Sequence, residues 1–187
     1  MSSSIIYDMI LMFIQYVPYA ILTGFIFMMI FCAYKAKVNG LPLFTYMNRS
    51  GKRLYLIYIF YIYCFMILGI TFLSREPGSR NSIDLMFFST ISHDWRMNIY
   101  PIENILLFIP MGMMLPKLNH RFTRPLPCLG LGFFISLSIE ISQLITERGY
   151  CQIDDILTNG LGCVIGYVCY WLYQYLHKKI RLISRKM

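Results

Sequence analysis

Five apolar segments, each long enough to cross a bilayer, constrain this chain more than any other feature of its sequence. They lie at residues 5–34, 54–73, 102–118, 126–146 and 156–176. A spanning helix needs about 20 mainly apolar residues, and only a helix or a closed barrel satisfies its own backbone hydrogen bonds in lipid. Charged residues make up only 14% of the chain, roughly half the usual share of a soluble domain. We therefore predict an all-α membrane protein with five transmembrane helices, forming a single integral membrane domain over residues 1–187.

The basic residues fall almost entirely on one side of the predicted helices. Thirteen of the 17 Lys and Arg residues lie within residues 35–53, 117–124 and 177–187, which five spans place on the same side. Cytoplasmic loops of membrane proteins carry an excess of Lys and Arg, so we expect a cell-membrane protein with its N-terminus outside and its C-terminus in the cytoplasm. The same distribution accounts for the net charge of +8 without nucleic acid, and we expect no nucleic-acid partner.

The loop between the second and third spans, residues 74–101, is polar but contains one short apolar stretch. This stretch is IDLMFFSTI, residues 83–91. It is too short to cross a bilayer, so we predict an interfacial or half-inserted helix there. The loop begins with SREPGSR, where the proline-glycine pair favours a turn that brings Arg75 and Arg80 towards one another.

Small residues and prolines predict where the helices contact or bend. Pro18 interrupts the first half of the first segment, which we expect to be kinked or interfacial. Pro110 and Gly112 predict a kink or a close helix contact within the third segment. Gly162 and Gly166 form a small-xxx-small face, which predicts that the fifth helix packs closely against a neighbour.

Polar residues gather at the outer ends of the predicted spans. Glu140 lies about two turns inside its apolar segment, where insertion of a charge costs roughly 2.5 kcal/mol or more. Side chains three or four positions apart share a helix face. One such face carries Ser136, Glu140, Gln143 and Glu147, and another carries Asp155, Asn159, Gly162 and Gly166. We predict that these stripes line one shared site; a polar network that only fixes helix packing is the alternative.

The residue types in these stripes favour an anionic, lipid-linked ligand. Arginine offers forked donors to phosphate or carboxylate, and acidic side chains can act as acid, base or hard-metal ligands. We assign catalytic roles to Glu140, Asp154 and Asp155, and ligand-binding roles to Arg75, Arg80, Gln143, Arg148 and Asn159. Two alternatives stay open. The arginines can simply pair with these carboxylates, and Asp154 and Asp155 can simply complement the dipole of a helix start.

The six cysteines show no spacing typical of a metal site, and we predict neither a metal site nor a disulfide framework. The sequence indicates no particular cofactor.

Four motifs occur in a fixed order along the chain. They are LSREPGSR (73–80), NILLFIPMGMMLP (104–116), SIEISQ (138–143) with Arg148, and IDDILTNGLGCVIGY (153–167). With these motifs, residues 54–176 resemble the VanZ family of bacterial membrane proteins. The resemblance implies a multi-pass cell-membrane protein associated with resistance to the glycopeptide antibiotic teicoplanin, without a settled reaction. It also adds Ser74 and Asn104 to the ligand-binding residues.

Three functions are compatible with this sequence. The first is an outer-leaflet site that binds or modifies a lipid-linked cell-wall precursor or the lipoglycopeptide drug, with membrane lipids as its other partners. The second is a non-catalytic accessory protein that limits partitioning of the drug into the membrane. The third is a small lipid transporter, which would carry polar groups into the cytoplasmic half of its spans. After Asn159 the fifth span reads GLGCVIGYVCYWLY, which disfavours the transporter.

Overall fold

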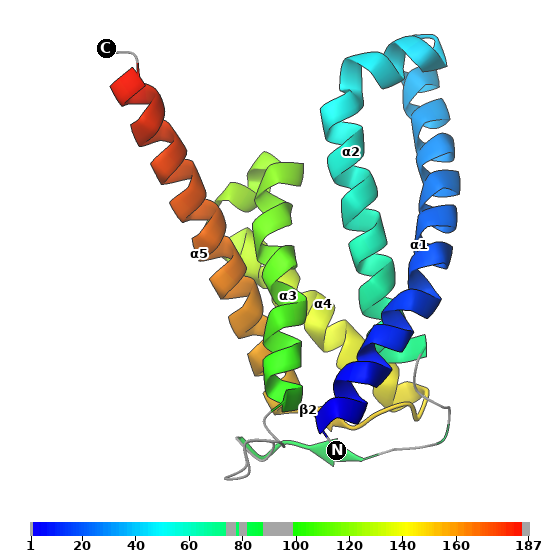
Figure 1. Ribbon diagram of the computed structural model, residues 1–187, viewed down its shortest axis with the longest axis vertical. Helices are drawn as coiled ribbons and strands as arrows, with labels where there is room; N and C mark the ends of the chain where they lie inside the picture. The colour runs from blue at the N-terminus through cyan, green and yellow to red at the C-terminus, as the bar shows by residue number, and fades with distance from the viewer. Residues whose placement is uncertain (1, 74–77, 79–81, 88–98, 185–187) are drawn as a thin grey trace. The chain divides into compact units, whose positions relative to one another are not determined.

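The protein is a helical membrane protein. The computed structural model describes residues 2–73, 78, 82–87 and 99–184. Its long helices are α1 (Ser2–Val38), α2 (Leu43–Leu68), α3 (Ile99–Leu118), α4 (Pro125–Ile145) and α5 (Ile153–Ser184), drawn in Figure 1. Its short elements are the π-helix η1 (Gly69–Leu73), the 3-10 helix η2 (His120–Thr123) and the strands β1 (Ile83–Asp84) and β2 (Cys151–Gln152). Within these described ranges, five helices are long and apolar enough to cross a membrane, which confirms the predicted fold class.

Residues Met1–Arg75 form one compact unit, built from α1 and α2. The rings of Phe27 and Tyr61 stack between the two helices with their centroids 4.7 Å apart. The Tyr58 hydroxyl donates a hydrogen bond to the carbonyl of Ile21, 3.2 Å away. Gly24 makes this approach possible, since a Cβ there would lie 3.0 Å from the Tyr58 ring. Aromatic packing on a small residue therefore holds the two helices together.

The connection between α1 and α2 is shorter than the sequence predicted. Basic residues through Arg53 were expected in a loop, but α1 continues to Val38 and α2 begins at Leu43, directly after Pro42. The reason is that Lys and Arg are good helix formers whose long side chains reach the membrane surface from a helix end. At its other end α2 continues into η1, where Gly69 packs against the Tyr16 ring.

Residues Glu76–Met187 form the second compact unit, which contains α3, α4 and α5. The link between α3 and α4 is capped by Asn119, whose side chain accepts a hydrogen bond from the Arg121 amide at 3.0 Å. Helix α5 has 32 residues. At 1.5 Å per residue it is about 48 Å long and exceeds the roughly 30 Å thickness of a hydrocarbon core. Its C-terminal turns extend past the end of α3 (Figure 1).

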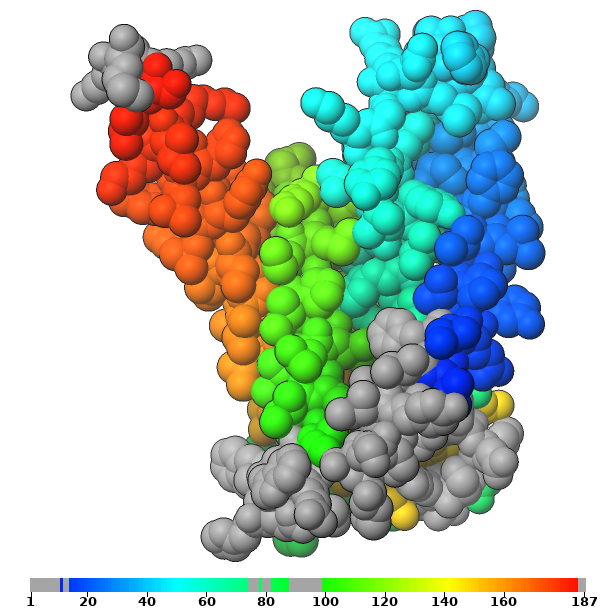
Figure 2. Space-filling view, in the orientation of Figure 1, coloured from blue at the N-terminus to red at the C-terminus, as the bar shows by residue number. Residues whose placement is uncertain are grey.

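Three glycines let α3 and α5 pack with their backbones in contact. A Cβ on Gly162 would overlap the carbonyl oxygen of Ile105, and one on Gly166 would overlap that of Ile109. In the opposite direction, a Cβ on Gly112 would overlap the Cys163 carbonyl oxygen. Figure 2 shows α3 lying directly against the N-terminal half of α5. The predicted close contacts at these glycines are thus confirmed.

The predicted interfacial helix at residues 83–91 is wrong in its described part. Residues 83–87 contain β1 and a turn, and β1 pairs in parallel with β2, with Ile83 opposite Cys151. The Cys151 amide also donates to the Ser82 carbonyl at 3.0 Å. The Asp84 carboxylate accepts from the Met86 amide at 3.0 Å, which turns the chain out of the strand. These bonds compete with those of a helix; residues 88–91 lie outside the described residues.

Candidate functional site

The C-terminal end of α4 is followed by a turn that folds the chain back beside the helix. The Glu147 amide donates to the Leu144 carbonyl, and the Arg148 amide donates to the Gln143 carbonyl at 2.9 Å. This pair of bonds is the Schellman motif, which needs a left-handed residue after the helix. Glu147 takes that position with a φ of 54°, although glycine is the usual choice. The turn directs the following residues into β2 at the end of α4.

Glu140 is the most deeply buried acidic side chain of the described part of the chain, with 2% of its surface exposed. Its Oε2 accepts a hydrogen bond of 3.1 Å from the backbone amide of Gln152 in β2. A hydrogen bond to a carboxylate is stronger than a neutral one and offsets part of the cost of burying the charge. The sequence could not identify this donor, because a backbone amide carries no side-chain signal.

Asp155 of α5 and Glu140 of α4 lie close to the same thiol. Burial raises the pKa of the half-buried Cys151, and the negative charges of Glu140 and Asp155 raise this pKa further. The two carboxylates come from different helices, and both act electrostatically on this residue of β2. Asp154 lies directly before Asp155 in the first turn of α5. Its side chain is buried, with 3% of its surface exposed. Acidic side chains at a helix start are stabilised by the helix dipole.

The polar site continues inward along the seam between α4 and α5. The Asn159 side-chain amide donates a 2.9 Å hydrogen bond to the hydroxyl oxygen of Ser136. Both side chains are buried, and the Asn159 Oδ1 atom has no hydrogen-bond partner among the described residues. Ser136 lies one turn before Glu140 on α4, and Asn159 lies one turn after Asp155 on α5. Both are therefore one turn further from β2 than the acidic residue on the same helix. Ser136 belongs to the stripe that the sequence predicted on α4, although no catalytic or ligand-binding role was assigned to it.

Beyond Ser136 and Asn159 the same seam becomes small and weakly polar. Cys163 packs against Gly132, and the Cys128 thiol lies 4.0 Å from the carbonyl oxygen of Gly112. Near the far end, the Tyr167 hydroxyl donates to the Thr123 carbonyl at 2.7 Å. In the described residues, the charged side chains of this seam therefore lie at the end next to β2.

The remaining predicted site residues differ in how the structure places them. Gln143 is buried on α4, whereas Arg148 is half-buried in the turn after it. Asn104 is half-buried on α3, one residue before the Ile105 carbonyl that Gly162 contacts. Ser74, Arg75 and Arg80 lie outside the described residues. Their proximity to Glu140 therefore stays a prediction.

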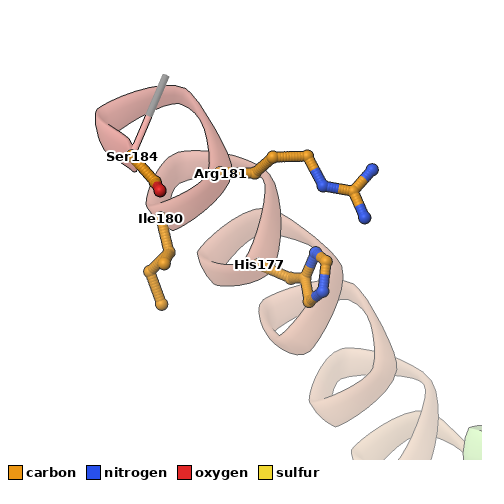
Figure 3. A pocket seen from close by; sticks show the side chains of 4 residues that line it. All are labelled: His177, Ile180, Arg181 and Ser184. Atoms are coloured by element: carbon orange, nitrogen blue, oxygen red, sulfur yellow. The ribbon is translucent and has the colours of Figure 1, made fainter. Parts of the chain in front are cut away.

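A shallow pocket lies on the C-terminal turns of α5. It is lined by His177, Ile180, Arg181 and Ser184, whose side chains are drawn in Figure 3. All four belong to one helix, so among the residues that the structure describes no second element encloses a ligand, and we assign none to this pocket. In the part of the chain that the structure describes, no three His, Cys, Asp or Glu side chains are grouped to hold a metal ion.

The sequence from residue 54 to residue 174 matches the family described as VanZ/LLP1. This chain belongs to the VanZ/LLP1 family. It is also similar to Protein VanZ of Enterococcus faecium, with 29% identity over 126 residues, which cover 67% of this chain and 74% of that protein. No solved structure matches this chain. The resemblance that the four motifs predicted is therefore confirmed.

The VanZ/LLP1 match contains the whole candidate site. It begins within α2 and ends within α5, so α3, α4 and both strands lie inside it. Helix α1 and the last turns of α5 lie outside the matched residues. The polar seam is thus a feature of the VanZ/LLP1 part of the chain.

Proposed function

We propose that this chain is a VanZ-type membrane protein that lowers the susceptibility of the cell to teicoplanin. In this proposal it acts through a site at the outer ends of α4 and α5, which binds or modifies a lipid-linked cell-envelope component or the drug itself. The observation that carries the proposal is the Glu140 carboxylate, buried in an apolar helix and held by the Gln152 amide. Ionisable side chains at such depth are costly and mark functional sites by default.

A purely structural role explains this carboxylate poorly. The Ser136–Asn159 hydrogen bond already joins α4 to α5 without a charge, and glycine contacts already join α3 to α5. A second carboxylate, Asp155, acts on the same Cys151 thiol as Glu140, although like charges repel each other in a low dielectric. Helix packing gains nothing from this repulsion. Acid-base chemistry gains from it, because a nearby like charge raises the pKa of a carboxyl group, and a polar headgroup bound there can donate hydrogen bonds to both carboxylates.

The predicted arginines supply the anion-binding half of the proposal. Arg148 follows α4 directly, and the Schellman turn fixes its backbone near the outer end of the helix. Arg75 and Arg80 are the further candidates. A forked guanidinium binds phosphate or carboxylate with two parallel hydrogen bonds. The outward orientation of this end rests on the excess of basic residues predicted for the opposite side.

Replacement of the two carboxylates by their amides tests the proposed function. The chain and its variants are expressed in a teicoplanin-susceptible bacterium, and the minimal inhibitory concentration of teicoplanin is measured. Glu140→Gln and Asp155→Asn keep side-chain shape but remove the charge, so we expect loss of protection at unchanged protein levels in the membrane. The matched control is Glu147→Gln. Glu147 belongs to the stripe that the sequence predicted, but its side chain is exposed in the adjacent turn, so this variant should keep protection.

The outcomes separate the proposed site from the accessory function. Full protection by both Glu140→Gln and Asp155→Asn, at normal levels in the membrane, contradicts a role for the charged site. A non-catalytic accessory protein would then be the better description. A lipid transporter is disfavoured by the thiols and glycines that follow Ser136 and Asn159 along the seam.

A further inference from the structure

The innermost polar atom of the site indicates which kind of ligand group it receives. Asn159 Oδ1 is a hydrogen-bond acceptor on a side chain with 4% of its surface exposed. Within the described residues nothing donates to it. A buried polar group without a hydrogen-bond partner is unfavourable, because no new bond replaces those it can make to water. A donor from a bound molecule would remove this cost.

The amide of Asn159 uses its nitrogen in a hydrogen bond within the protein. Its Nδ2 donates to the hydroxyl oxygen of Ser136, which is itself fully buried. In this arrangement Oδ1 points away from that hydrogen bond and presents an acceptor to a second molecule. The site therefore offers a buried acceptor without a partner among the described residues, next to α4.

The surroundings of this acceptor favour a neutral donor over an anion. Glu140 stands four residues from Ser136 along α4, which is about 6 Å of helix rise. A phosphate at the inner end would bring negative charge and further acceptor oxygens between Asn159 Oδ1 and the Glu140 carboxylate. Both contacts would be repulsive in a low dielectric. A hydroxyl, by contrast, donates to either atom without adding charge.

We propose that the inner end of the site binds a hydroxyl of a sugar headgroup, with Asn159 Oδ1 as the acceptor. This inference rests on the ligand site of the proposed function and names the substrate class of that site. The sugar can belong to a membrane glycolipid or to the glycopeptide drug, which share this hydroxyl chemistry. Any phosphate of the same ligand would lie towards Arg148, at the outer end.

Lipid retention by the purified full chain tests the proposal. The protein is purified in an amine-oxide detergent without sugar and mixed with monoglucosyl diacylglycerol or with phosphatidic acid of the same acyl chains. Native mass spectrometry then measures the bound fraction of each lipid, and teicoplanin is tested as a third probe. We expect retention of the glucosyl lipid, of teicoplanin or of both, and about tenfold weaker retention of phosphatidic acid, which corresponds to about 1.4 kcal/mol.

Two substitutions separate binding by Asn159 from its structural role. Asn159→Leu removes the acceptor, whereas Ser136→Ala removes the internal hydrogen bond but leaves Oδ1 in place. We expect Asn159→Leu to weaken retention of the sugar-bearing probe about tenfold, the effect of one lost hydrogen bond in a dry site. Ser136→Ala should keep most of it. Ser142→Ala, on the exposed face of α4, is the control, and the thermal stability of each variant is measured alongside.

Several results would overturn this inference. Equal or stronger retention of phosphatidic acid would do so, as would full retention of the sugar-bearing probe by Asn159→Leu. Equal losses of retention and of thermal stability in Asn159→Leu and Ser136→Ala would mean that the pair only holds the helices together. Teicoplanin protection without retention of either sugar-bearing probe contradicts the inference and leaves the proposed function standing. Sugar retention without protection contradicts the proposed function and leaves the ligand class standing.

Discussion

Replacement of Gly162 by alanine should separate α3 from α5 and destabilise the protein. The added Cβ would overlap the Ile105 carbonyl oxygen and would also lie 3.0 Å from the carbonyl carbon and 3.1 Å from the Cα of that residue. All three are backbone atoms, so no flexible side chain can give way. Helix α5 must move by roughly 1 Å, and gaps of that size forfeit a quarter to a half of the attraction between facing atoms.

The expected size follows from two opposing effects. Overpacking a closely fitted contact costs typically about 1–3 kcal/mol, and a rigid backbone obstacle places this variant near the upper limit. Alanine is a better helix former than glycine by about 1 kcal/mol, which offsets part of the loss. We therefore expect Gly162→Ala to lower the free energy of unfolding by about 2 kcal/mol. Gly162→Leu should prevent assembly of the two helices.

Gly160→Ala is the matched control, two residues earlier on the same helix. A Cβ at Gly160 meets no atom within 4 Å, so this variant should gain up to about 1 kcal/mol from helix propensity alone. Both variants are unfolded in mixed micelles with increasing sodium dodecyl sulfate, and helix content is followed by circular dichroism. If Gly162→Ala unfolds at the wild-type midpoint, or Gly160→Ala is destabilised as much, the backbone contact does not hold α3 against α5.

Three further predictions concern the turn and strand after α4. Cys151 is a free thiol outside the membrane-spanning helices, and the predicted orientation places it on the outer side. A membrane-impermeant thiol reagent should therefore label it in intact cells. Labelling only after lysis would contradict this orientation. Since the charge of Glu140 raises the pKa of this thiol, Glu140→Gln should lower that pKa and speed alkylation of Cys151 at pH 8, whereas an unchanged rate would place the carboxylate elsewhere. Glu147→Gly should raise the free energy of unfolding by about 1 kcal/mol, because glycine adopts a positive φ without steric cost; a less stable variant would contradict this.

Side-chain patterns were sufficient to predict the helices and the glycine contacts. Apolar length located five spans, and the spacing of Gly162 and Gly166 predicted a close contact before its partner was known. The spacing of Glu140 on one helix and Asp155 on another predicted one shared site; both charges act on the Cys151 thiol, and the shared site itself stays a prediction. In each case a physical requirement of lipid or packing acts directly on side chains, so it leaves a pattern in the sequence.

Features that depend on backbone groups could not be predicted in the same way. The strand pairing of β1 with β2 joins residues far apart in the chain. The group that binds Glu140 is the backbone amide of Gln152, and every residue except proline carries such an amide, so the sequence does not single it out. The left-handed Glu147 goes against its own preference, and η1 departs from the α-helix that the apolar run predicted. Tertiary contacts override local preferences at such positions.

The hydrogen bond from Gln152 to Glu140 has a consequence for biosynthesis. Glu140 precedes the amide that binds it by twelve residues, so α4 leaves the ribosome while the donor of this hydrogen bond is still inside the exit tunnel. A lone α4 in lipid would bear the full cost of that charge. We therefore expect α4 and α5 to enter the bilayer together as a hairpin, after the Schellman turn has formed. β1 is synthesised before α3 and α4, so it stays unpaired at the membrane surface until β2, which follows α4, has been synthesised.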